Sequence, residues 1–224
     1  MSFLFRPTAR ILRDGTALSA PEAGLVRLDI ACGLGEIGEA TLTLWLRSRL
    51  ADLAPGARLA IALGPAGDET AVFTGLVAHI ARAPAVVTVL AREPTAALEA
   101  HFVSRAYLNQ SAATVARDLA APVENDTIEA DLDLAQYGVE NRRDAWWHLR
   151  DLARLAGCDL MASPAGKLIM RPAGRGATHA LRHGADVLAF ETAEQAAPPS
   201  LAYAAHGGAS SAGPDRWQDR KSVV

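Results

Sequence analysis

The chain has 224 residues, of which 50% are hydrophobic and 21% charged, a balance typical of a globular protein with a packed core. Its net charge of −3 gives no bulk attraction to nucleic acid. Two cysteines without a CxxC pair exclude a disulfide scaffold and the common zinc motifs. The first residues lack a signal-peptide pattern, and no apolar run approaches the ~18 residues of a membrane helix. We therefore expect a soluble, cytoplasmic protein that binds neither nucleic acid nor, by itself, a membrane.

Residues 1–93 carry short apolar segments that are separated by turn-like joins rich in Gly and Pro. In residues 40–46 the leucines alternate with polar residues, so that Trp45 faces away from the leucine side of a strand. Such segments without a convincing helix indicate an antiparallel barrel or sandwich, and we predict a β-barrel domain over residues 1–93. The strand-like segments are residues 25–32, 40–46, 57–64, 69–82 and 85–92.

Residues 94–174 change to a mixed pattern that predicts a small α/β domain. Residues 109–122 have the period of a helix, which Ser111 or Asn109 can cap. A polar stretch follows, then a second helix, and then a strand–turn–strand hairpin with its turn at residues 164–166.

The last part of the chain returns to strand-like segments. Residues 175–208 predict strands of a second β domain, the start of an incomplete β-barrel. Residues 209–224 are rich in Ser, Gly and Pro and then charged, which predicts a flexible tail. The expected fold class is therefore α+β and mainly β.

Two adjacent tryptophans mark the second helix, which we expect within residues 140–160. On a helical wheel of ~100° per residue, Trp146 falls at the edge of the apolar face and Trp147 in the opposite, polar sector. Asn141 is expected to cap this helix, with Asp144 three residues later completing a box-like start.

Trp147 lies between arginines on the polar face of this helix, and three interpretations of it are open. It can pack under the preceding residues 133–138, or it can form a subunit contact, since Trp and Arg are enriched at interface hot spots. A platform for a sugar or nucleotide is the third, and no neighbouring residue supports it. Our candidate interface residues are Trp147, Arg150, Arg154 and, on the exposed side of its strand, Trp45.

The segment GLGEIG, residues 33–38, has the glycine spacing of a dinucleotide-binding turn. That site needs a helix directly after the turn, so that the pyrophosphate meets the helix N-terminus. Here the strand-like EATLTLWL follows. We therefore interpret the segment as a hairpin turn and expect no cofactor.

Other polar clusters do not predict a metal or catalytic site. His179 and His183 stand four residues apart with Asp186 nearby, but Gly184 and the strand-like surroundings disfavour the helix that a metal pair needs. A run of carboxylates lacks the EF-hand pattern and predicts a solvated acidic loop. Neither a nucleophile elbow nor a phosphate-binding loop is present, so we expect no enzyme. The carboxylates are Glu124, Asp126, Glu129, Asp131 and Asp133.

The order of these segments resembles the phage late control protein D family and the VgrG-like hubs of contractile injection systems. A β-rich unit, a short helix and the phrase QYGVENRRDAWWHLRDLARLAGCDLMASPAGKLIMRPA follow one another as they do in that family. The segment LRHGADVLAF is similar to the turn and strand that come next there. The resemblance covers most of residues 20–208 and rests on the order and spacing of its motifs. The matching residues are Asp144, Trp146 or Trp147, Leu149, Leu152, Ala153, Gly157, Gly166, Lys167 and Leu168.

The resemblance implies a structural hub without catalysis. Such hubs are trimers at the centre of a baseplate, and they join a sixfold tail tube to a threefold spike through a ring of β-barrels. The implied partners are other copies of the chain, as a homotrimer or another ring, the tail tube protein and the spike protein. The implied location is the cytoplasm before assembly and the tail or injection particle afterwards.

This chain departs from the family pattern after Gly174, because about 50 residues remain for a second barrel and no spike domain follows. Either the chain is truncated or a second polypeptide supplies the rest. Two other hypotheses stay open. One is a tail-associated module that binds or cleaves the cell wall. The other is a β-rich scaffold protein unrelated to phage.

Overall fold

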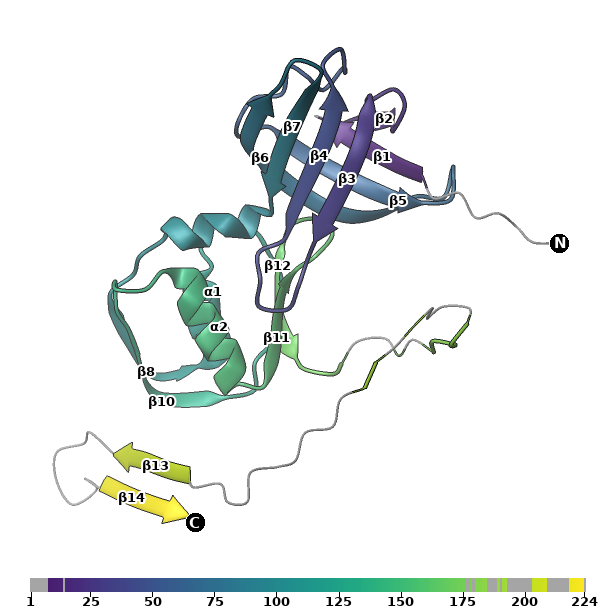
Figure 1. Ribbon diagram of the computed structural model, residues 1–224. Coiled ribbons are helices and arrows are strands. Elements are labelled where there is room, and N and C mark those ends of the chain that lie inside the picture. The colour runs from purple at the N-terminus through teal and green to yellow at the C-terminus, as the bar shows by residue number, and fades with distance from the viewer. Residues whose placement is uncertain are drawn as a thin grey trace. The chain divides into compact units, whose positions relative to one another are not determined.

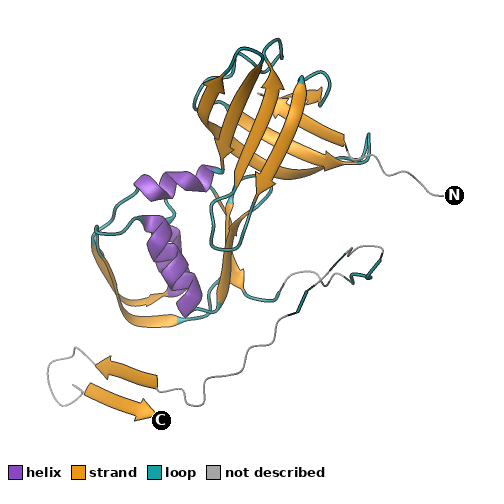
Figure 2. Ribbon diagram, viewed as in Figure 1, coloured by secondary structure: helices purple, strands orange, loops and turns teal. Residues whose placement is uncertain are grey.

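The computed structural model describes residues 8–13, 15–175, 178, 180–184, 189, 191–192, 203–208 and 218–223. The chain divides into two compact units, residues 1–176 and residues 177–224. The first unit is mainly β, with a large antiparallel sheet followed by two α-helices and smaller sheets (Figures 1 and 2). The predicted fold class, α+β and mainly β, is confirmed. The domain boundaries at residues 93, 174 and 208 stay predictions.

Seven strands form the large sheet, in the order β2-β1-β5-β6-β7-β4-β3, and all of its neighbours are antiparallel. The sheet curls around its core (Figure 1), and register shifts in β5 and β6 add to the bend. Among the described strands no ladder joins the edges β2 and β3, so the curl is that of an incomplete barrel. The strands are β1 (Thr8–Arg13), β2 (Thr16–Ser19), β3 (Leu25–Ala31), β4 (Glu39–Trp45), β5 (Arg58–Gly64), β6 (Thr70–Arg82) and β7 (Val86–Arg92).

Alternation along the strands produces the core of this sheet. In β4, Leu42 and Leu44 are fully buried, and they lie opposite Val89 and Val87 of β7. Five of the seven strands coincide with the predicted segments, because their apolar residues recur with the period of two that a pleated strand requires. The β1–β2 hairpin was not predicted. Its short strands bury only Ile11 and Leu18.

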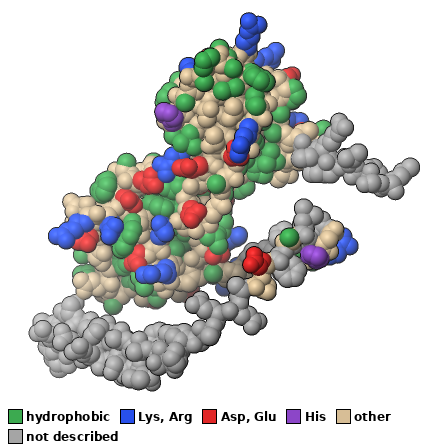
Figure 3. Space-filling view, viewed as in Figure 1, with side chains coloured by type: hydrophobic (Ala, Val, Ile, Leu, Met, Phe, Trp, Pro, Cys, Tyr) green, Lys and Arg blue, Asp and Glu red, His purple; other side chains and the backbone are tan. Residues whose placement is uncertain are grey.

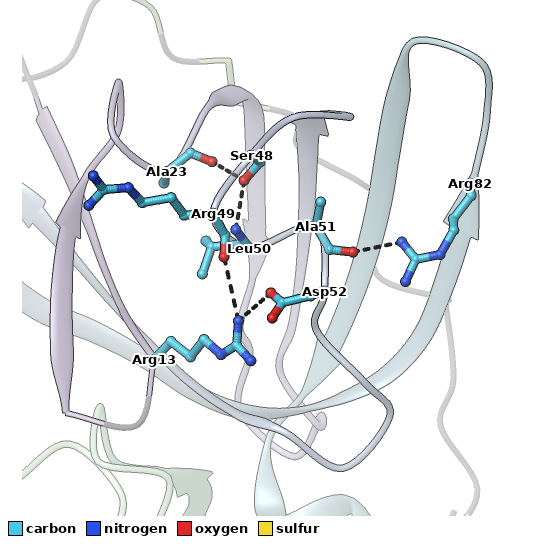
Figure 4. A network of polar contacts seen from close by, with 8 residues as sticks. All are labelled: Arg13, Ala23, Ser48, Arg49, Leu50, Ala51, Asp52 and Arg82. Atoms are coloured by element: carbon cyan, nitrogen blue, oxygen red, sulfur yellow. Dashed lines mark hydrogen bonds and ion pairs between the residues drawn. The ribbon is translucent and has the colours of Figure 1, made fainter.

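The segment between β4 and β5 covers one end of the sheet (Figure 4). Its Leu50 side chain is fully buried. Polar contacts hold the segment in place: Arg13 of β1 pairs with Asp52, Arg82 of β6 donates to the carbonyl of Ala51 at 2.7 Å, and the Ser48 hydroxyl donates to the Ala23 carbonyl. These contacts tie β1, β6 and the turn between β2 and β3 to one loop.

The α/β region contains two α-helices, a 3₁₀-helix and five strands. A three-stranded sheet has the order β11-β12-β9, in which β12 and β9 are parallel, and β10 and β8 form a two-stranded ribbon. The elements are η1 (Pro94–Ala100), β8 (Arg105–Ser111), α1 (Ala112–Leu119), β9 (Asn125–Ile128), β10 (Asp133–Val139), α2 (Ala145–Leu155), β11 (Cys158–Ala162) and β12 (Leu168–Pro172).

Three of these strands were missed in the sequence. The stretch interpreted as polar contains β9 and β10, and β8 precedes the first helix. β9 is four residues long and has one buried residue, Ile128. Its partner β12 lies about forty residues further along the chain, so the local pattern cannot reveal the pairing. The predicted hairpin of β11 and β12 is confirmed, with Gly166 at φ 79° in its turn.

The caps of the two helices decide between the predicted alternatives. Ser111 caps α1 by accepting a hydrogen bond from the Thr114 amide at 3.2 Å, whereas Asn109 lies inside β8. For α2 the prediction of Asn141 is wrong. Asp144 is the cap and accepts from the Trp147 amide at 2.7 Å, because the helix begins at Ala145.

Contacts between the large sheet and the α/β region come from loops. The GLGEIG segment joins β3 to β4, as predicted, and the Gly35 amide donates to the carbonyl of Leu160 at 2.7 Å. The Thr74 hydroxyl of β6 donates to the carbonyl of Pro164 at 2.8 Å, in the turn between β11 and β12. Glu93, which is buried, accepts from the Gly38 amide at 2.7 Å. One backbone hydrogen bond and one from the Thr74 side chain therefore link the large sheet to the α/β region, whereas the Glu93 bond joins the start of β4 to the end of β7.

The second unit contains a described antiparallel hairpin of β13 (Tyr203–Gly208) and β14 (Gln218–Val223). β14 lies within the segment expected to be a flexible tail, and that expectation stays a prediction. Of the residues considered for a metal, His183 is described, whereas His179 and Asp186 lie outside the described residues.

Candidate interaction surface

The outward face of α2 carries three of the four candidate residues. The other face of the helix packs into the core of the α/β region, where Trp146 is 5% exposed and Leu149 is fully buried. Trp147 is 40% exposed, and Arg150 and Arg154 are exposed beside it. The predicted division between the two tryptophans is confirmed. It follows from the 100° step between neighbouring residues of a helix.

Trp147 is held in place by its neighbours in sequence. The guanidinium of Arg143 lies over its ring, 5.2 Å from the ring centroid. The rings of Trp147 and His148 are nearly perpendicular, with an interplanar angle of 89° and centroids 5.1 Å apart. His148 is itself buried, with Nε2 at 3.0 Å from the Glu140 carbonyl oxygen. Asp144 fixes the start of the helix. The large exposed indole therefore has a defined position, which lowers the entropy lost when it binds a partner.

A groove of about 620 Å³ lies between Trp147 and the ends of β8 and β10. Burial, followed by the effect of the nearby Asp151 carboxylate, raises the pKa of Tyr137 to about 12. The phenol thus stays protonated near neutral pH and donates to the carbonyl of His148 at 3.3 Å. The groove is lined by Ser104, Arg105, Ala106, Tyr137, Gly138, Val139, Glu140, Trp147, His148 and Asp151.

A second hollow, of about 220 Å³, is lined by Trp147, Arg150, Asp151 and Arg154 of α2. Arg154 pairs with Asp151 at 3.1 Å, and the Arg154 side chain is 82% exposed. An ion pair this exposed contributes well under about 1 kcal/mol to folding. The arginines of this face are therefore available for a partner at little expense to the fold.

Trp45 lies elsewhere, at the end of β4. It is 55% exposed, and Leu46 beside it is 46% exposed. It lines a groove of about 630 Å³ together with Pro21, Gly24 and Pro84. The structure thus brings Trp147, Arg150 and Arg154 together and places Trp45 on a separate surface of the large sheet. In Figure 3, hydrophobic side chains gather over the sheet, whereas charges of both signs are spread over the α/β region.

Sequence reasoning missed two residues of the α2 surface, Arg143 and Tyr137. The spacing of four residues between Arg143 and Trp147 is a usable signal, because side chains four apart lie together at a helix end. No such signal exists for Tyr137, which reaches the groove from β10. Packing beside residues 133–138 was one interpretation of Trp147. The groove does place it near Tyr137 and Gly138, yet two fifths of the side chain stays exposed.

The described residues contain no group of three or more His, Cys, Asp or Glu side chains that could hold a metal ion. In the acidic segment, Glu124 pairs with Lys167 at 3.2 Å. None of the described helices is long and apolar enough to cross a membrane.

The arrangement of a curled antiparallel sheet followed by this α/β region is a fold found in phage tail proteins. The 43 kDa tail protein of prophage MuSo2 from Shewanella oneidensis matches 75% of this chain with a TM-score of 0.58 and 17% identity. A tail protein from Neisseria meningitidis MC58 matches 73% with a TM-score of 0.57 and 15% identity. A chain of the PdpA–VgrG complex of Francisella matches 75% with a TM-score of 0.51 and 12% identity.

These likenesses concern the fold, since the identities are low. The aligned part spans 56%, 50% and 31% of the three matched chains, so this chain corresponds to about half or less of each. No family model matches the sequence, and no curated protein matches it.

Proposed function

We propose that the chain is a structural hub or adaptor at the centre of a phage tail or contractile injection baseplate, where it joins the tail tube to the spike through a ring of subunits. The observation that carries this proposal is the shared fold: three quarters of the chain superimpose on a solved tail protein with a TM-score of 0.58. The likeness to a chain of a VgrG complex supports the same role.

The surface of the protein is suited to subunit contacts. Exposed tryptophans line grooves on two different parts of the first unit, at Trp45 and at Trp147. Buried Trp and Arg side chains contribute most of the binding energy at many interfaces. We take the partners to be further copies of this chain, as a trimer or another ring, the tail tube protein and the spike protein. In this role the chain is not an enzyme and resides in the tail or injection particle.

The test is the native mass of the full chain by size exclusion with light scattering, alone and mixed with a tail tube protein from the same source. A trimer, another closed ring or a complex with the tube protein is the expected result. A chain that stays monomeric and does not bind the tube protein would overturn the proposal. The variant Trp147→Ala should weaken association while leaving the protein folded, because Trp147 is 40% exposed and does not belong to the hydrophobic cluster that contains Trp146.

One observation favours a second candidate, a module that binds or cleaves the cell wall. Tyr137 and Trp147 line one groove together with the carboxyl-bearing Glu140 and Asp151. Aromatic rings and carboxylates are the groups that bind and cleave glycans. Pull-down with purified peptidoglycan and a turbidity assay test this candidate. Retention on peptidoglycan that Trp147→Ala abolishes would favour it over the hub.

A further inference from the structure

The α2 surface has a counterpart of opposite charge on the same chain. Asp126, Glu129, Asp131 and Asp133 are all exposed, and together they form an acidic edge along β9 and the loop that leads into β10. Two cations lie beside it: Lys167 pairs with Glu124, and Arg117 donates to the carbonyl of Ile128 at 2.8 Å. The four carboxylates and Glu124 outnumber these two cations, so the acidic edge keeps a net negative charge.

The acidic edge is held at a defined position. The Ala112 amide at the start of α1 donates to the carbonyl of Leu132 at 2.8 Å, and Asp133 pairs with Ser111 across the ribbon. Carboxylates near a helix N-terminus are stabilised by the helix dipole. Since the loop is anchored to α1, its charges form a surface of fixed shape.

The two charged surfaces cannot meet within one copy. β10 begins at Asp133, on the acidic edge, and ends at Val139, in the groove beside Trp147. Six residue steps of a strand separate these ends by about 20 Å. When two complementary surfaces lie at separate places on one chain, one copy can bind the next head to tail. This kind of contact generates rings.

We propose that the acidic edge of one copy docks on the α2 surface of the next, with Trp147 at the centre of the contact and Arg150 and Arg154 paired to the incoming carboxylates. This inference rests on the proposed function, for which it names the subunit contact. The Trp147 ring supplies apolar contact area, and the opposite charges set which surface it meets. Contacts between exposed charges weaken with salt, since the screening length is about 8 Å at physiological ionic strength.

Charge reversal tests the contact. Arg150→Glu with Arg154→Glu alters the α2 surface, and Glu129→Lys with Asp131→Lys alters the acidic edge. Each pair should weaken self-association about tenfold or more, because like charges then face each other. A chain that carries all four changes should associate as the wild type does, since the two surfaces are complementary again. Light scattering over a concentration series, at low and high NaCl, measures the association.

A matched control reverses two exposed arginines in the region of the large sheet, Arg27→Glu with Arg49→Glu, and changes the net charge as much as the α2 variant does. It should associate like the wild type. Circular dichroism of every variant verifies the fold, and all altered side chains are exposed.

The remaining outcomes separate this inference from the proposed function. If the wild type forms a ring that the charge reversals leave intact, the copies meet at another surface. That result refutes the proposed contact and leaves the proposed hub function unaffected. A closed dimer overturns the head-to-tail arrangement. A chain that stays monomeric yet binds the tube protein refutes the contact alone. A chain that stays monomeric and does not bind the tube protein refutes both the proposed contact and the proposed hub function.

Discussion

The first unit contains two hydrophobic cores that are built in different ways. The core of the large sheet consists of side chains that alternate along strands, and most of those strands pair with neighbours in sequence. The core of the α/β region combines two short helices with strands that pair over long distances, such as β9 with β12. The first core therefore depends on local pattern, whereas the second depends on contacts between distant segments.

The two regions also differ in their surfaces. The sheet exposes hydrophobic side chains such as Val26, Trp45 and Leu46, whereas the α/β region surrounds its exposed Trp147 with charged groups. A contact at the sheet would gain from apolar burial and tolerate salt. One at α2 would be selective for a partner of opposite charge and sensitive to salt. In the proposed ring, the α/β region would supply this selectivity.

The largest effects are expected from truncating one side chain in each core. Leu42→Ala in the sheet and Leu149→Ala in α2 should each lower the free energy of unfolding by about 2–5 kcal/mol, because both side chains are fully buried and leave a cavity. Urea unfolding measures the loss. A control at the exposed Leu155 of α2, Leu155→Ala, should change stability by less than about 0.5 kcal/mol.

The same two variants sharpen the comparison of the cores. Hydrogen exchange of peptides from each region reports where protection is lost. If the cores form one cooperative unit, either variant accelerates exchange in both. Faster exchange confined to the region of the mutation would contradict a single unit and divide it between β7 and η1.

A smaller effect is expected where the hairpin turn meets the sheet region. In Gly166→Ala the new Cβ would lie 2.9 Å from Cδ of Pro94, at a φ of +79° that side chains rarely adopt. We expect a loss of about 1–3 kcal/mol. The control is Gly157→Ala at the end of α2, where φ is +61° but no heavy atom lies within 4 Å of the added Cβ. Its loss of stability therefore measures only the cost of a positive φ for a residue with a side chain. Equal losses in thermal unfolding would contradict crowding at the turn.

The caps of the helices give the next effect. Asp144→Ala removes the acceptor of the Trp147 amide and should destabilise the protein by about 1 kcal/mol. Asp144→Asn keeps an acceptor oxygen and should retain most of the stability. The corresponding change on α1 is Ser111→Ala. If Asp144→Ala proves neutral in urea unfolding, the assignment of this cap is wrong.

The smallest effect concerns pH and the buried Glu93, which links the loop before β4 to the end of β7. Burial raises its pKa above the ordinary value of 4.5, and the Gly38 amide opposes this shift. The folded state thus holds the proton more tightly than the unfolded state does. The resulting stabilisation is complete below pH 4.5 and is lost as the pH rises through the raised pKa.

Glu93→Gln keeps a carbonyl oxygen for Gly38 and removes the titration. The stability of the wild type minus that of the variant should therefore fall between pH 4.5 and neutral pH. Taking the difference cancels the other carboxylates, several of which have lowered pKa values and act in the opposite direction. A difference that is flat, or that rises with pH, would contradict a raised pKa for Glu93.

Sequence reasoning performed best where burial and period coincide. Five strands of the sheet, both helices and the hairpin turn at Gly166 were predicted, and Trp146 and Trp147 were assigned to opposite faces of α2. It failed for the short strands. The period of two needs several residues to be visible, and β9 has four residues of which one is buried. It also misplaced the cap of α2, because Asn141 and Asp144 are both good caps and packing chooses between them.

The sequence by itself determined the mainly β fold class, the outward position of Trp147 and the arginines beside it, because these depend on the repeat of a strand or helix and on nothing distant. Only the tertiary structure decided the groove between Trp147 and the ends of β8 and β10, the separation of Trp45 from it, and the link from Glu93 to Gly38. Each of these needs groups that are dozens of residues apart in the chain or lie on different elements. The pairing of strands and the packing of helices bring such groups together, and a local sequence pattern does not predict either.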